Sequence, residues 1–391
     1  MKLLPRVMLI IISIIFSSDA ISEIRINGFA SIVAGQDTDN KSFINSPYTD
    51  EISFKAESKF ALQISTDLSQ GLSATAQMIA RGSNDFDTVF EWAYLSYELN
   101  DSHTIRAGKL RLPFYKYSDY LDVGYAYPWI RPPRAMYSLT FSTYEGLSLL
   151  SNFSLSDWDI SSNIVYGNLE DTFFKTTNPT EGKLKDIYGI NIQVSKDWFS
   201  AYVAYFGTDV LIPTSSIETV AQITESVSPG NGTKISLDSD YGDFLGLGFT
   251  IDYGNWLFNT EWSAISIEES LTLDTEQWYT SIAYRFDEIM PYVTYQTTET
   301  KRKIAAISDT LLPTQIHPAQ PPLNIFLQSA LDGQMFEYNA YTIGIKYDFH
   351  ANAALKFEYN RYDDIVDIGS LGSFDNPASS GNFSVAIDLV F

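Results

Sequence analysis

The sequence predicts an all-β protein, a transmembrane antiparallel β-barrel of sixteen strands with one loop folded inward to constrict its interior. Three observations predict this fold. Apolar and polar residues alternate with a period of two, the connections between these runs are short and long in turn, and the final residue is the aromatic Phe391. Such alternation turns one face of each strand toward lipid and the other toward the lumen of a barrel.

The composition excludes several classes of protein. The 391 residues carry a formal net charge of -23, and this acidic balance argues against a nucleic-acid-binding protein, which needs a basic surface. Past residue 20, no apolar run approaches the roughly 20 residues that a membrane helix needs. Three histidines and no cysteine leave little for metal or thiol chemistry, so we expect no metal and no cofactor.

Residues 1–20 have the pattern of a secretory signal peptide. A basic start precedes an apolar run over 7–16, and Ala20 ends a small-residue cleavage motif. The apolar run is too short to span a bilayer. We therefore expect export with cleavage of this segment, and a single transmembrane barrel domain over 21–391 that is held together without disulfides.

The strands follow from the alternating runs in chain order. In the last run, apolar side chains occupy every second position of 383–391. Each run is long enough for the roughly 9–11 residues with which a tilted strand crosses a bilayer. No comparably long stretch of 21–391 keeps a clean helical period. The expected strands are 23–35, 51–66, 71–83, 89–99, 104–113, 143–155, 159–168, 184–195, 198–208, 241–253, 255–267, 276–286, 290–300, 337–349, 353–363 and 382–391.

The connections between these strands alternate between short turns and long loops, as they do in outer-membrane barrels. An even number of strands places both chain ends on the short-turn side. Trp158, Trp198 and Trp256 each lie at or just after a short turn, which predicts an aromatic belt at the membrane interface. The same alternation directs Leu247 to lipid and Lys346 to the lumen.

Three segments carry a resemblance to a known family: INGFASIVAG near the start, TIRAGKLRLPF before a long loop, and FSVAIDLVF ending at Phe391. With them the chain resembles the general porins of the Gram-negative outer membrane. The resemblance implies a passive diffusion channel for small hydrophilic solutes and ions, with no enzymatic activity. It further implies a homotrimer in a bilayer with outer-leaflet lipopolysaccharide, and a C-terminal strand that the barrel assembly machinery reads. The acidic PEFGG-like loop tip usual in that family is missing, and RLPFYKYSDYLDVGYAYPWIRPP resembles anion-preferring porins.

The segment around the long loop after the fifth strand contains the candidate selectivity residues. Residues 104–140 hold six bases and two acids, a balance of 6 - 2 = +4 in an otherwise acidic chain. Charges in a narrow pore with low-dielectric walls focus the field and select the ions that pass. We therefore expect a pore constriction here with a weak preference for anions. Its candidate residues are Arg106, Lys109, Arg111, Lys116, Asp119, Asp122, Arg131 and Arg134.

Charged residues on the polar faces of neighbouring strands extend this set along the luminal wall: Arg25, Lys55, Glu57, Lys59 and Arg81. A second interpretation has equal weight. The bases pair with luminal acids and simply hold the loop against the wall.

Two other classes of function stay open. A secreted soluble β-sandwich that serves as a binding module would show the same alternation, with its tryptophans in a core. An outer-membrane β-barrel enzyme would need a serine and a histidine side by side on the barrel wall. His103, His317 and His350 all fall outside the predicted strands, which argues against an enzyme.

Overall fold

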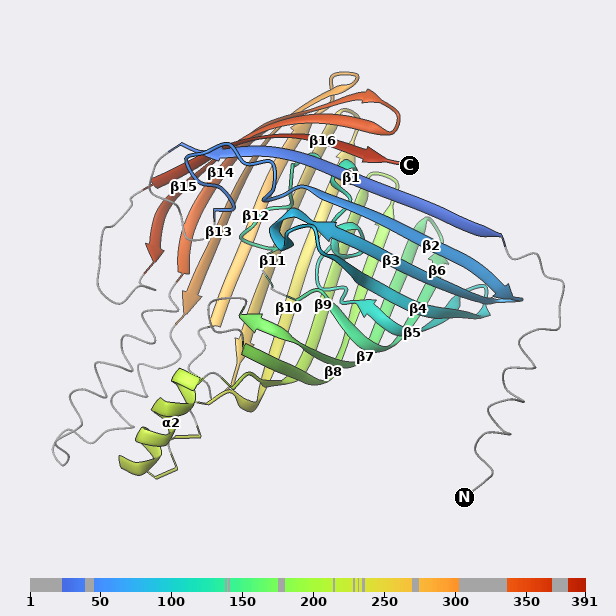
Figure 1. Ribbon diagram of the computed structural model, residues 1–391. Coiled ribbons are helices and arrows are strands. Elements are labelled where there is room, and N and C mark those ends of the chain that lie inside the picture. Colours follow the sequence, from blue (N-terminus) through green and yellow to red (C-terminus); the bar gives the residue numbers. More distant parts are fainter. Residues whose placement is uncertain are drawn as a thin grey trace.

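The protein folds into a barrel in the computed structural model (Figure 1). The structure describes residues 23–38, 46–137, 139, 141–174, 180–213, 215–227, 229–230, 232–233, 236–268, 274–301, 336–367 and 379–391. The expected signal peptide and His317 lie outside these residues.

Sixteen antiparallel strands form one closed sheet, in which each strand pairs with its neighbours in sequence and β1 pairs with β16. The predicted fold class and strand number are therefore confirmed, and the alternative of a two-sheet sandwich is wrong. The strands are β1 (Ile24–Asp37), β2 (Lys59–Ser69), β3 (Leu72–Arg81), β4 (Thr88–Asn100), β5 (His103–Arg111), β6 (Thr143–Leu155), β7 (Trp158–Phe174), β8 (Thr180–Lys196), β9 (Phe199–Leu211), β10 (Asp238–Tyr253), β11 (Trp256–Ile267), β12 (Asp274–Tyr284), β13 (Ile289–Lys301), β14 (Phe336–His350), β15 (Ala353–Asp367) and β16 (Ser379–Val390).

The second strand begins later than the sequence predicts. The alternation placed a strand over 51–66, but β2 begins at Lys59. Before it the chain turns, because the Ser58 hydroxyl donates to the carbonyl of Phe54 at 2.6 Å. An alternating pattern does not distinguish a paired strand from an extended loop, and this segment makes only an isolated bridge to β1.

Short helices occur in the long connections. The α-helix α2 (Ser215–Val227) lies at the long-loop end of the barrel (Figure 1). It lies in the predicted loop 209–240, where we expected no helix. Its acidic Glu218 in the first turn favours a helix start. Three 3₁₀ helices are η1 (Gly82–Asn84), η2 (Ser118–Tyr120) and η3 (Gly124–Ala126). No helix in the described part of the chain has the length and apolarity to cross a membrane.

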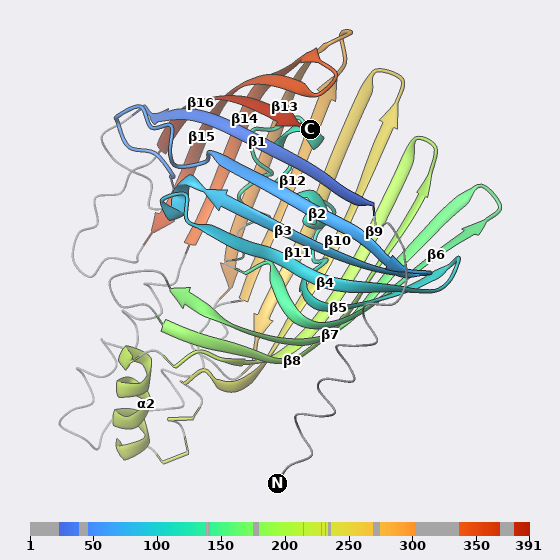
Figure 2. The ribbon, with the colours of Figure 1, turned by 45° about the vertical axis from the view of Figure 1, so that its right-hand side comes forward.

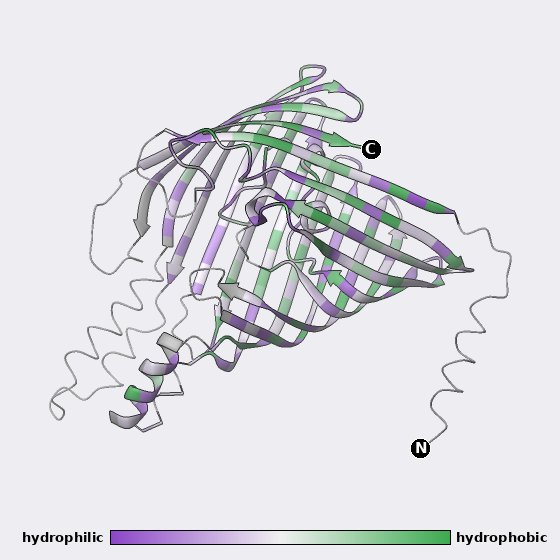
Figure 3. Ribbon diagram, in the orientation of Figure 1, coloured by the Kyte–Doolittle hydropathy of each residue, from purple (hydrophilic) through white to green (hydrophobic). Residues whose placement is uncertain are grey.

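The outer wall of the barrel is apolar and the inner wall is mostly polar, as the alternating colours along the strands in Figure 3 show. Leu247 is 43% exposed and Ile343 is 60% exposed on the outer face, whereas Lys346 is 7% exposed and points inward. The register predicted at these positions is correct. The tryptophans Trp158, Trp198 and Trp256 at the short turns are also exposed.

The last residue closes the barrel against the first strand. Phe391 and Gly28 exchange two backbone hydrogen bonds of 2.9 and 2.7 Å. The Phe391 ring lies over Gly28, where a Cβ atom would come within 2.4 Å of the ring. A larger residue at position 28 would therefore displace the ring from the position that it takes in this closure.

Candidate functional site inside the barrel

The segment 112–142 between β5 and β6 crosses the interior of the barrel, where both views show it within the ring of strands (Figures 1 and 2). The Trp129 indole donates to Thr294 on β13 at 2.8 Å, and the amide of Ile130 donates to Glu358 on β15 at 3.1 Å. These strands stand across the ring from β5 and β6. The segment therefore spans the lumen from one wall to the other.

The tyrosines of segment 112–142 pack against other luminal side chains and do not line an open path. Tyr115, Tyr117 and Tyr127 are buried among the luminal side chains of the apolar core. The Tyr117 hydroxyl donates to Asn259 on β11 at 3.1 Å. Together these contacts fix the backbone that carries the charged residues.

A first charged cluster surrounds Asp122. Its carboxylate accepts from Arg81 at 2.8 Å and from Arg111 at 2.7 Å, and Lys59 lies 3.6 Å away. Glu91 on β4 pairs with the same two arginines. Burial by itself would raise the pKa of Asp122, but the three cations outweigh it and hold the pKa well below its usual range. Asp122 is therefore a permanently charged anchor.

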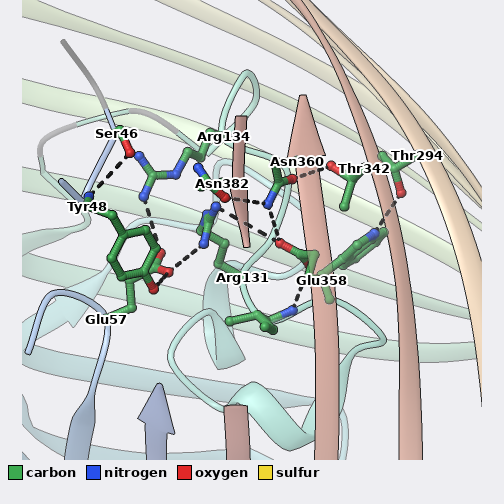
Figure 4. A network of polar contacts seen from close by, with 12 residues as sticks. Ser46, Tyr48, Glu57, Arg131, Arg134, Thr294, Thr342, Glu358, Asn360 and Asn382 are labelled. Carbon is green, nitrogen blue, oxygen red and sulfur yellow. Dashed lines mark hydrogen bonds and ion pairs between the residues drawn. The ribbon is translucent and has the colours of Figure 1, made fainter. Parts of the chain in front are cut away.

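A second charged cluster surrounds Glu57 in the segment before β2 (Figure 4). Arg131 and Arg134 both pair with its carboxylate, Arg134 at 3.2 Å, and Tyr48 also donates to it. Arg131 lies 4.0 Å from Glu358 on β15. Burial would raise the pKa of Glu57, but the two arginines lower it below its ordinary value.

Lys116 lies on the same segment, beside a carboxylate that the sequence did not single out. Glu261 on β11 accepts hydrogen bonds of 2.6 Å from the hydroxyls of Tyr137, Tyr202 and Tyr279, and one of 3.1 Å from the Lys116 amide. Burial lowers the pKa of the Lys116 ammonium to about 8, although Glu261 partly opposes it. Lys116 therefore loses its charge just above neutral pH.

A further group that the sequence did not single out joins the segment to the last two strands. Lys356 on β15 donates to the carbonyl of Gly124 at 2.6 Å and to that of Trp129, and pairs with Asp388 on β16 at 2.8 Å. Both charged side chains are fully buried. Alternation does place Lys356 and Asp388 on the luminal face, but their pairing depends on a register that the sequence does not reveal.

The other predicted residues lie apart from these clusters. Arg106 faces the lumen over the Tyr94 ring, 5.2 Å from its centroid, and Asp119 is exposed. The Lys109 ammonium donates to the Phe90 carbonyl at 3.0 Å, and its strand position pairs with Ala93 on the outer face. The prediction that groups Lys109 with the luminal bases is therefore wrong.

Two predicted wall residues lie at the ends of the barrel. Arg25 pairs with Asp67 at 2.8 Å at the short-turn end, and both side chains are about half exposed. Lys55 lies before β2 and pairs with Asp85, so it is not part of the strand wall. The error follows from the misplaced start of β2.

The histidines lie closer to the strands than predicted. His103 is the first residue of β5 and His350 the last residue of β14. The His103 ring Nδ1 lies 2.8 Å from the Ser151 hydroxyl. Ser151 is only 6% exposed, so this pair offers little access to a substrate. In the described residues, no group of three or more histidine, aspartate or glutamate side chains is arranged to hold a metal ion.

Comparisons with known proteins agree with the barrel fold. Residues 11–376 match the family model of the Gram-negative porins. A comparison with curated proteins finds no significant match. Among solved structures, the chain is similar to the anion-selective porin from Comamonas acidovorans, with a TM-score of 0.56 and 12% identity over 95% of this chain and 100% of that one.

Two further solved structures are similar. Salmonella typhi OmpF in complex with daunomycin has a TM-score of 0.54 and 13% identity over 94% of this chain and 97% of that one. The trimer form of Vibrio cholerae OmpT has a TM-score of 0.53 and 9% identity over 95% and 99%. At these identities the likeness shows a shared fold. The family model, in contrast, covers most of the sequence, and the chain therefore belongs to the Gram-negative porins, the channels of the outer membrane.

Proposed function

We propose that this porin is a non-enzymatic, passive diffusion channel for small hydrophilic solutes and ions, and that segment 112–142 forms its constriction and gives it a weak preference for anions. The observation that carries the proposal is the charge balance of the ion pairs across the lumen. The clusters around Asp122 and Glu57 contain five bases and four carboxylates, a balance of 5 - 4 = +1.

Most of the remaining inner charges cancel in pairs, as Lys346 and Asp348 do, and the buried Asp37 at the end of β1 adds one acid. Lys116 and Glu261 form one neutral set, and Lys356 and Asp388 form another. Arg106 and Asp119 add one charge of each sign. Within the two clusters the bases thus hold the segment in place and still leave one positive charge in excess, so the two interpretations of the sequence are compatible.

The preference is weak because nearly every base has a carboxylate partner. Most of the acid that makes the whole chain negative lies elsewhere, and charges more than about 8–10 Å from a permeating ion are screened in physiological salt. The charges at the narrowest point act at shorter range and between low-dielectric walls. They therefore decide the sign of the selectivity.

The surroundings of the barrel are part of the same proposal. Trp158, Trp198 and Trp256 form a belt at the membrane interface, and Phe391 is the signal that the barrel assembly machinery reads. A cleaved signal peptide directs export, and lipopolysaccharide surrounds the long-loop end. The trimer form of the similar Vibrio cholerae structure supports a homotrimer.

Planar bilayer recording tests the channel and its selectivity together. The purified porin should produce stepwise increases in conductance, and a salt gradient should give a small zero-current potential of the sign expected for anions. Absence of conductance steps from correctly folded protein would remove the channel proposal. A potential of the opposite sign would remove only the anion preference.

A further inference from the structure

An apolar cavity of about 220 Å³ lies inside the barrel, toward its long-loop end. It lies between the two ends of segment 112–142 and the wall of β8 to β11, and it is partly open. Its lining includes Phe114, Phe141, Val210, Phe206, Phe244 and Ile267.

Apart from two glycines, the described lining is aliphatic and aromatic except for Thr208, Asp243 and Ser266. Asp243 and Ser266 stand opposite each other on β10 and β11 and share the strand face of the outward-pointing Leu247. Their side chains therefore point away from the cavity. The cavity has no charged group with which to bind an ion.

An apolar inner wall is unusual for a water-filled barrel, whose lumen is normally polar. Here Phe244 is paired with Phe206 on one side and with Ile265 on the other, so three large apolar side chains point inward together. Phe114 packs between the rings, 4.7 Å from the centroids of both Phe206 and Phe244, with Phe141 at 5.9 Å.

These contacts are explained by the need to anchor segment 112–142, but anchoring does not explain the unfilled cavity beside them. Protein interiors are close-packed, with few voids larger than a water molecule. An engineered, closed apolar cavity of about 150 Å³ in another protein stays dry and binds benzene. The cavity here is larger, and its rings already meet edge to face, the arrangement in which a further aromatic ring gains contact energy.

We propose that this cavity binds a small, uncharged aromatic molecule that enters through the lumen. A lipid chain is a poor alternative, because the closed wall of paired strands separates the cavity from the bilayer. A charged ligand is disfavoured because the lining offers no partner to replace its water. The porin thus has a saturable site for a class of compound unlike the hydrophilic solutes and ions that its constriction passes.

Binding of fluorobenzene, followed by ¹⁹F NMR on the intact porin in detergent micelles, tests the proposal. Partition into micelles is not saturable, so the site appears as a saturable change in shift and line width. Val210→Phe fills the cavity from its lining. Val293→Phe makes the same chemical change on the lipid-facing wall, where Val293 is exposed, and serves as the matched control.

The native porin and Val293→Phe should show the same saturable binding, and Val210→Phe should bind at least tenfold more weakly. Ile267→Phe provides a second filled variant if Val210→Phe does not fold, which the heat-dependent gel shift of the barrel reveals. Equal binding by filled and control variants would overturn the proposal. Absence of saturable binding by the native porin would also overturn it, including the case in which another part of the chain fills the cavity. Equal affinity for 4-fluorobenzoate would refute the assignment to uncharged ligands.

Discussion

Asp122 is the residue whose removal should loosen the constriction most. Its carboxylate lies 2.7, 2.8 and 3.6 Å from Arg111, Arg81 and Lys59. At an effective dielectric constant of about 20, these distances correspond to gross attractions of about 6, 6 and 5 kcal/mol. Desolvation and repulsion among the cations offset most of this sum. Removing one partner of a buried ion pair typically costs about 3–5 kcal/mol.

We therefore expect Asp122→Asn to destabilise the folded segment by about 3 kcal/mol, since asparagine keeps some of the hydrogen bonds. Asp119→Asn is the matched control, because it makes the same charge change on the same segment at an exposed side chain. Unfolding in denaturant with the porin in detergent measures the difference in stability. Single-channel recording should show noisier currents in Asp122→Asn alone.

Both substitutions remove one negative charge, so both should shift the zero-current potential toward greater anion preference. Only Asp122→Asn should lower stability. If the two variants have equal stability and equal current noise, the ion pairs of Asp122 do not hold the segment, and its role as an anchor is refuted.

Three further outcomes are expected. Leu247→Arg should lower the free energy of unfolding in lipid by about 2–4 kcal/mol, whereas Leu247→Phe should lower it little, because only arginine places a charge in lipid. Equal decreases would show that the register is wrong. Deletion of Phe391 removes both hydrogen bonds to Gly28 and should reduce the yield of heat-modifiable barrel; a normal yield would contradict its role in closure. Raising the pH from 7 to 9.5 should discharge Lys116, whose pKa is about 8, and weaken anion preference more in the native porin than in Lys116→Gln. An unfolded chain keeps this proton to about pH 10.5, so discharge in the fold should also raise stability between about pH 8 and 10.5, as denaturant titration would show.

The barrel could be predicted from the sequence because each strand has its own local pattern. Alternation places Leu247 outside and Lys346 inside without knowledge of any neighbour, and the structure agrees at both positions. The same pattern failed at 51–58, since it reports which face a side chain takes and not whether the backbone is paired. Helix α2 was missed because a short amphipathic stretch within a loop gives only a weak periodic signal.

The site was harder to predict from the sequence, because it depends on contacts between distant residues. The excess of bases in 104–140 pointed to the segment that the structure places inside the barrel. The sequence could not show that three cations would surround Asp122 or that Glu57 would pair with Arg131 and Arg134. Glu261 and Lys356 were missed for the same reason, since each is an ordinary luminal position until segment 112–142 is placed against it.

The zero-current potential across a planar bilayer tests the central claim most directly. Removing Arg131 and Arg134 with Arg131→Ala/Arg134→Ala changes the balance of the two clusters from 5 - 4 = +1 to 3 - 4 = -1, or to 0 once Glu57 takes up a proton. Lys183→Ala is the control, because Lys183 is exposed and pairs with Glu170 at 2.8 Å, away from the inner clusters. We expect the native porin and Lys183→Ala to show the same weak anion preference, and the double variant to lose or reverse it. A cation-selective potential that is the same in all three proteins would contradict the claim that the inner clusters set the selectivity.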